Sequence, residues 1–262
     1  MLRFHVGGEP IFADVRGPAP ADLACVPLLP FANRIANARF VVDGRHIALE
    51  PAHDEPHALH GTGWLRAWEV AASGNDWADL RLESPAGDGG WPWAWQGHQG
   101  FHLNECGYRY SIKLTNLGGS PMPAGIGLHP WLPRTLATRY CGLHSAEWQP
   151  GPDRLPRDFA ARAMPSDWWD GAPVASRRVD CCQVGRAGSL LIDWPERGLR
   201  LEMVPDAVFG FTQVYVPDAE FFCVEPVSHL PDAVNRDGDT GLRWLAPGET
   251  LAGTVEFRVS SV

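Results

Sequence analysis

The sequence contains a single lysine, Lys113, no basic run and no long apolar segment. A formal net charge of −9 without clustered cations argues against binding along nucleic-acid phosphates. No stretch approaches the roughly 20 apolar residues that cross a bilayer. Residues 1–10 also lack the charged and apolar regions of a signal peptide. We therefore expect a soluble, cytoplasmic protein that binds neither nucleic acid nor membrane.

Motifs for metals and nucleotides are also missing. The six cysteines form no C-x-x-C pair, and no H-E-x-x-H is present. His53, His57 and His60 lie close together, but Pro56 would break a helix that aligned them as metal ligands. There is neither a P-loop nor a complete G-x-G-x-x-G. We expect reduced thiols, no metal and no cofactor.

Proline and glycine, by contrast, are abundant, with 24 and 28 residues, and helix signals are scarce. The prolines and glycines divide the chain into short runs, which is typical of a fold with many strands and turns. We expect one all-β domain over residues 1–262. The twelve tryptophans suit both a wide sheet-on-sheet core and stacking on sugar rings. Residues 151–173, rich in Pro, Asp and Trp, are expected to form an elaborated loop.

The clearest strand signal lies between Tyr108 and Thr115, where apolar and polar residues alternate with period two. A turn of composition NLGGS follows, and a second extended run reaches His129. In that run Gly125, Gly127 and His129 share one face. The two glycines leave either a flat floor for a ligand ring or a bulge in the strand.

His129 and Glu225 each precede a proline, which favours extended geometry and predicts positions at strand ends or edges. Glu225 follows the apolar run FFCV, which predicts a buried strand that ends in a carboxylate. Rigid strand ends suit catalytic groups. Position alone favours a purely structural interpretation, in which Glu225 is a solvated carboxylate and His129 a hydrogen-bonded histidine.

Three further polar residues stand in apolar or turn settings. They are Arg34 in PFANRI, His60 in ALHG, and Asp180 before Cys181 and Cys182. Each one alone is compatible with a structural ion pair, a cap or a turn.

Four segments together resemble the aldose 1-epimerase (galactose mutarotase) family, and they occur in the family's order. The third contains G-x-H-P after a T-N-x-G turn, and the fourth reads V-E-P-x-x-H-x-P-D-A-x-N. The segments are Pro30–Arg45, His57–Val70, Leu114–Trp131 and Phe221–Asn235. Ala38 departs from the resemblance, because the family usually has glycine there, and the segment before Cys25 is short.

The resemblance implies a large antiparallel β-sandwich of the galactose mutarotase type that binds a small-molecule sugar. The sequence leaves a monomer and a homodimer open. It implies that His129 is the general acid and Glu225 the general base. Arg34 and His60 match substrate-binding positions, and Asp180 matches a substrate-binding aspartate in a divergent VDCC context.

The implied reaction, interconversion of the α and β anomers of an aldose, requires ring opening. A base removes the proton of the anomeric hydroxyl, and an acid protonates the ring oxygen. We expect the two groups on opposite sides of the C1–O5 region, with Glu225 ionised and His129 protonated. Neither a metal nor a nucleotide is required. Trp131 is placed to stack on the sugar or to pack in the sandwich.

Two alternatives remain open. A hexose-6-phosphate epimerase would need convergent cations, which Arg34, Arg39 and Arg66 are able to supply. After LHG, however, the run GWLRAW lacks the F-A-R associated with the phosphate-specific branch. A non-catalytic sugar-binding or sensing protein would not need both His129 and Glu225.

Overall fold

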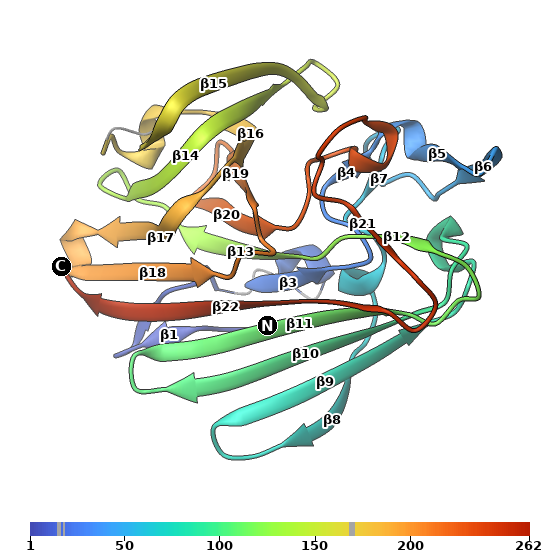
Figure 1. Cartoon of the computed structure of the whole chain (residues 1–262). Helices are drawn as coiled ribbons and strands as arrows, with labels where there is room; N and C mark the ends of the chain where they lie inside the picture. Colours follow the sequence, from blue (N-terminus) through green and yellow to red (C-terminus); the bar gives the residue numbers. More distant parts are fainter. Residues whose placement is uncertain (15–16, 18, 168–170) are drawn as a thin grey trace.

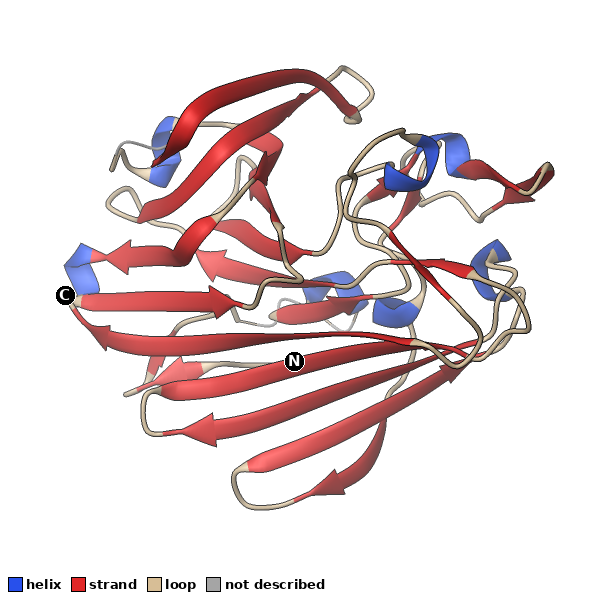
Figure 2. Cartoon of the chain, in the orientation of Figure 1, coloured by secondary structure: helices blue, strands red, loops and turns tan. Residues whose placement is uncertain are grey.

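The computed structural model describes residues 1–14, 17, 19–167 and 171–262. Strands and short 3-10 turns make up the ordered elements (Figures 1 and 2). Most strands join one large antiparallel sheet, whose order is β3-β13-β20-β19-β16-β14-β17-β18-β22-β11-β10-β9-β8, with β15 paired to β14. None of the helices within the described ranges has the length and apolar character needed to cross a bilayer.

The sheet forms two layers (Figure 1), which confirms the predicted all-β sandwich. The lower layer contains β8 (Glu69–Ser73), β9 (Trp77–Ser84), β10 (Trp95–Asn104), β11 (Gly107–Asn116), β18 (Leu199–Pro205) and β22 (Thr250–Ser261). The upper layer contains β3 (Cys25–Leu28), β13 (Gly127–Pro133), β14 (Arg139–Pro150), β15 (Pro156–Asp167), β16 (Val179–Val184), β17 (Ala187–Trp194), β19 (Phe211–Val216) and β20 (Phe221–Val227).

Short elements lie at the edges. The strand pairs are β1 (His5–Val6) with β2 (Glu9–Pro10), β4 (Arg34–Ile35) with β7 (Ala58–Leu59), β5 (Arg39–Val42) with β6 (Arg45–Ala48), and β12 (Met122–Ala124) with β21 (Arg243–Leu245). The 3-10 turns are η1 (Pro20–Asp22), η2 (Ala36–Ala38), η3 (Gly63–Leu65), η4 (Asp88–Gly90), η5 (Val174–Ser176), η6 (Pro195–Arg197) and η7 (Ala233–Asn235).

The main core lies between the layers and confirms the period-two pattern of β11. Tyr108, Tyr110, Ile112 and Leu114 are all buried in it. Large aromatic rings fill the wide gap, and Trp95 and Trp194 are both fully buried there. Burial of each such side chain contributes on the order of 1.5–3 kcal/mol.

The expected loop over residues 151–173 is wrong for most of its length. Pro156–Asp167 forms β15, an edge strand that pairs with β14, while residues 168–170 lie outside the described part of the chain. Apart from its first residue, β15 is largely exposed. A strand without a buried face has no need of apolar alternation, so its sequence carries no period-two signal.

The prediction that both pre-proline residues lie at strand ends or edges is also wrong, because both lie inside central strands. His129 lies inside β13, between β3 and β20, and Glu225 lies inside β20. The pairing of β13 with β20 is interrupted between Gly127/Val227 and Trp131/Cys223. Both prolines fall in this interruption, so their missing N–H groups are tolerated within a central pair of strands.

Packing requires a glycine at position 125, because a side chain there would clash with a neighbour. Gly125 therefore does not serve as a flat floor for a ligand ring. A Cβ atom at Gly125 would lie 2.0 Å from Cδ2 of His229. His229 is itself held, because its Nε2 accepts from the Ala32 N–H and its Nδ1 donates to the Leu230 carbonyl. At Gly127 a Cβ would approach Val227 to 2.9 Å.

We therefore expect Gly125→Ala to lower the free energy of unfolding by roughly 1–3 kcal/mol, as overpacking does in tight cores. Urea denaturation measures this change. Gly119→Ala is the control, because a Cβ there meets no atom within 4 Å. A Gly125→Ala protein as stable as the control would contradict the packing interpretation.

One departure from the family pattern has a local explanation. Ala38 adopts a positive φ of 52°, in the left-handed region that glycine occupies at no steric cost. An alanine there costs on the order of 1 kcal/mol. The family's usual glycine therefore suits the left-handed backbone at this position. This chain adopts the same backbone conformation with an alanine.

Candidate active site

One row of side chains crosses five neighbouring strands of the upper layer. Strand register places Val26 beside His129, Glu225 beside Gln213, and Gln213 beside Cys182. All point to the face of the sheet that turns away from the main core. A second apolar cluster, which includes Val26, Trp131, Cys182, Cys223 and Val227, covers this face and surrounds the row.

His129 and Glu225 meet within this row. His129 Nε2 lies 3.3 Å from Glu225 Oε1, and the two residues are 9% and 2% exposed. The expectation that they face each other across the sugar is wrong, because neighbouring strands bring them into direct contact. Trp131 stacks on the imidazole with 4.1 Å between ring centroids and fixes the plane of His129.

The environment of Glu225 favours its protonated form. Burial raises the pKa of Glu225 well above its ordinary value, and the nearby Asp180 raises it further, whereas Arg34 lowers it. Its Oε2 atom is buried and has no hydrogen-bond partner among the described residues. A carboxylate in this setting is a stronger base than one in water.

His60 lies beside His129 and presents a fixed tautomer. Its Nδ1 accepts a hydrogen bond from the Asn33 N–H at 3.0 Å, so the proton of the neutral ring is on Nε2. Burial lowers the pKa of His60 well below its ordinary value, with further contributions from His129 and Arg34. His60 therefore offers a neutral N–H donor. Its φ of 62° shows that this placement is held against backbone strain.

Arg34 connects two carboxylates at the same site. Its Nε donates to Glu55 at 2.9 Å, and one terminal nitrogen donates to Asp180 at 3.3 Å. Asp180 also accepts from the Gln213 side chain at 2.6 Å. These contacts leave Arg34 and Asp180 rigid, as positions that bind a ligand require.

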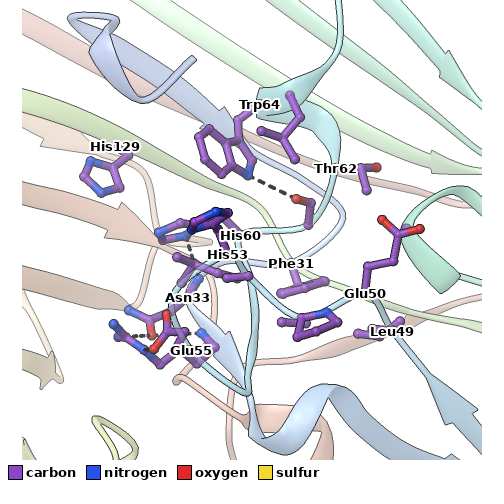
Figure 3. A pocket seen from close by; sticks show the side chains of 18 of the residues that line it. Phe31, Asn33, Leu49, Glu50, His53, Glu55, His60, Thr62, Trp64 and His129 are labelled. Carbon is purple, nitrogen blue, oxygen red and sulfur yellow. Dashed lines mark hydrogen bonds and ion pairs between the residues drawn. The ribbon is translucent and has the colours of Figure 1, made fainter. Parts of the chain in front are cut away.

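A cavity of about 620 Å³ brings the five predicted residues together, which is a usual size for a small-molecule site. They are His129, Glu225, Arg34, His60 and Asp180. Figure 3 shows His60 and His129 near Trp64 at one end and Thr62, Glu50 and Leu49 toward the other.

The motif V-E-P-x-x-H-x-P-D-A-x-N supports the chain segment around Arg34 that forms part of the cavity wall. The Asp232 N–H donates to the Arg34 carbonyl, and its side chain accepts from the Ala36 N–H. Asn235 donates to Asp232 and to the Arg39 carbonyl. The histidine, aspartate and asparagine of V-E-P-x-x-H-x-P-D-A-x-N thus support the chain around Arg34 and do not line the cavity.

Other cavity residues were missed by sequence reasoning. Glu55, Trp64, Arg154 and Tyr215 line the cavity, and Gln213 binds Asp180. Trp64 lies in a segment of the resemblance, but nothing there distinguishes it from a core tryptophan. Arg154 reaches the cavity from the turn between β14 and β15, where no motif marks it.

Comparisons with known proteins place the chain in a family. The model of the aldose 1-epimerase family matches residues 11–258. The chain therefore belongs to the aldose 1-epimerase family, a family of all-β sandwich proteins to which the sequence motifs already pointed.

Individual relatives agree with this assignment. The uncharacterized protein YphB of Escherichia coli strain K12 is 32% identical over 250 residues, covering 91% of this chain and 84% of YphB. A solved structure from E. coli K12, provisionally described as an aldose 1-epimerase, is similar at a TM-score of 0.88 and 27% identity, covering 100% of this chain and 92% of that one. Galactose 1-epimerase from Lactobacillus acidophilus shares the fold at a TM-score of 0.72 and 16% identity, with coverage of 97% and 86%.

Proposed function

We propose that this protein is an aldose 1-epimerase that interconverts the α and β anomers of a free aldose. The observation that carries the proposal is the contact between His129 and Glu225, at 3.3 Å, on the wall of a cavity that also contains a fixed His60 N–H donor. An acid and a base in contact suit a reaction that moves two protons at one carbon.

In the proposed mechanism Glu225 removes the proton of the anomeric hydroxyl while His129 protonates the ring oxygen. The C1–O5 bond breaks, and C1 becomes an aldehyde. The hydroxyl oxygen and the ring oxygen are bonded to the same carbon, so neighbouring acid and base groups are able to reach both. Rotation about C1–C2 and reclosure, with the proton roles reversed, yields the other anomer.

The raised pKa of Glu225 supports its role as base. A general base is most effective when its pKa lies near the operating pH, because it is then both available and strong. His60, Arg34 and Asp180 have the donors and acceptors to hold the sugar hydroxyls. The proposed reaction uses these side chains and needs no cofactor.

The charge of the cavity supports a neutral aldose over a phosphorylated one. Its described lining includes six acidic side chains, those of Glu50, Asp54, Glu55, Asp88, Asp180 and Glu225, against the cations of Arg34 and Arg154. Arg34 already contacts two carboxylates, and Arg66 pairs with Asp88. Arg34 and Arg66 are therefore not free to bind a dianionic phosphate, and the acidic side chains of the described lining outnumber Arg154.

We therefore expect kcat/KM for α-D-glucose or α-D-galactose to exceed that for glucose 6-phosphate by at least about tenfold, which corresponds to about 1.4 kcal/mol of charge repulsion. Polarimetry of freshly dissolved sugars measures both rates. A faster reaction with the phosphate would favour the phosphate-specific alternative. Thermal stabilisation by a sugar without any mutarotation would instead indicate a binding protein.

A further inference from the structure

A third group lies next to His129 and Glu225, the acid and base that line the cavity. Cys223 lies two residues before Glu225 on β20, so both side chains project from the same face of the strand. One ligand atom each from His129, Cys223 and Glu225 lies within 4.8 Å of the other two. Cys223 carries a thiol and is completely buried.

An imidazole, a thiolate and a carboxylate together form a ligand set for zinc-like ions. Tetrahedral coordination with bonds of 2.0–2.3 Å separates neighbouring ligand atoms by about 3.5 Å. The His129–Glu225 pair already has this spacing, at 3.3 Å. Movement of the thiol by about 1 Å would complete three ligands.

A second observation at Glu225 also indicates a ligand. Its Oε2 atom is buried without a hydrogen-bond partner in the described structure, and the residue lines the cavity. Buried carboxylate oxygens are normally satisfied, and one left without a partner indicates a missing ion, water or ligand. His129 borders the same cavity, so a fourth coordination position would open toward the substrate.

We propose that His129, Cys223 and Glu225 form a binding site for a soft divalent cation such as Zn²⁺. The cation binds as an inhibitor that competes with the sugar, because its ligands include the acid and the base. Binding displaces the Cys223 thiol proton and the proton of the Glu225 carboxyl group to solvent, and the fourth position holds water. The inhibition rests on the proposed function, whereas the binding site does not.

Cobalt(II) binding tests the site independently of activity. Titration of the chelator-treated protein with Co²⁺ is expected to produce a thiolate-to-cobalt charge-transfer band in the near-ultraviolet spectrum. Cys223→Ser and Cys223→Ala are expected to abolish the band. Cys182→Ser is the matched control, because Cys182 is equally buried in the same apolar cluster. No band in the wild type, or a band retained in both Cys223 variants, would overturn the proposal.

Inhibition is the second measurement. Zn²⁺ is expected to suppress mutarotation reversibly, with recovery on addition of a chelator. The half-inhibitory concentration should rise at least about tenfold in Cys223→Ala and remain unchanged in Cys182→Ser, once thermal melts show that both variants are folded. Equal zinc sensitivity in the two variants would overturn competitive binding at this site. A wild type with the cobalt band but no mutarotation would overturn the proposed function and leave the metal site intact.

Discussion

Glu225→Gln is expected to lower the mutarotation rate at least about 10²-fold and at the same time to stabilise the protein at neutral pH. The loss of rate follows because an amide cannot accept the proton of the anomeric hydroxyl. The gain in stability follows because burial and Asp180 raise the pKa of Glu225, so an ionised carboxylate at this position disfavours folding.

The direction of the pH dependence follows from proton binding. Because its pKa is raised in the folded protein, Glu225 binds its proton more tightly there than in the unfolded chain. Its contribution to stability is complete below the unfolded-state pKa and decreases as the pH rises toward the folded-state pKa. Each tenfold difference in proton affinity corresponds to about 1.4 kcal/mol. Glutamine does not titrate. The free energy of unfolding of the variant therefore lacks the decrease with rising pH that Glu225 causes in the wild type.

Polarimetry and urea denaturation between pH 5 and pH 8 check both effects. Glu147→Gln is the matched control, because Glu147 is also buried in the upper layer but does not line the cavity. We expect it to keep a rate near that of the wild type. Wild-type activity in Glu225→Gln would show that another group is the base.

His129→Gln is expected to reduce the rate by about 10²–10⁴ while the protein stays folded. The glutamine side chain donates a hydrogen bond but cannot deliver a proton to the ring oxygen. Its size keeps most of the packing against Trp131, which stacks on the imidazole in the wild type. A low rate in this variant therefore reports on proton transfer.

The control for His129→Gln is a substitution at a second histidine that also lies near a carboxylate. His98 approaches Asp79 at 3.6 Å on the lower layer and does not line the cavity, so His98→Gln should retain the wild-type rate. Circular dichroism shows whether each variant is folded. Equal rates in the two variants would remove His129 from the mechanism.

The fold class and the candidate residues were accessible to sequence reasoning for different reasons. The alternation of β11 and the frequency of proline and glycine predict an all-β domain, because strands with one buried face repeat every two residues. The resemblance adds the sandwich architecture. The site residues came from motif resemblance. That resemblance works because His129, Glu225 and Arg34 each stand in a segment whose neighbours shape the local backbone, as His229 and Asp232 do around Arg34.

Other features were predicted wrongly or missed because they depend on contacts between distant segments. The sequence left Gly125 open as part of a ligand floor or of a bulge, because the residue that packs against it, His229, lies more than a hundred positions away. Glu55 and Gln213 carry no motif, and they become relevant only because Arg34 and Asp180 lie beside them.

The sequence by itself determined the β-sandwich, the family and the five residues on which the proposed site rests, because these depend on local periodicity and short motifs. Only the tertiary structure decided that His129 and Glu225 touch, that burial raises the pKa of Glu225, and that Cys223 lies beside them. Contact and burial depend on which strands become neighbours. Strand order is set by the packing of the whole chain, and no single segment encodes it.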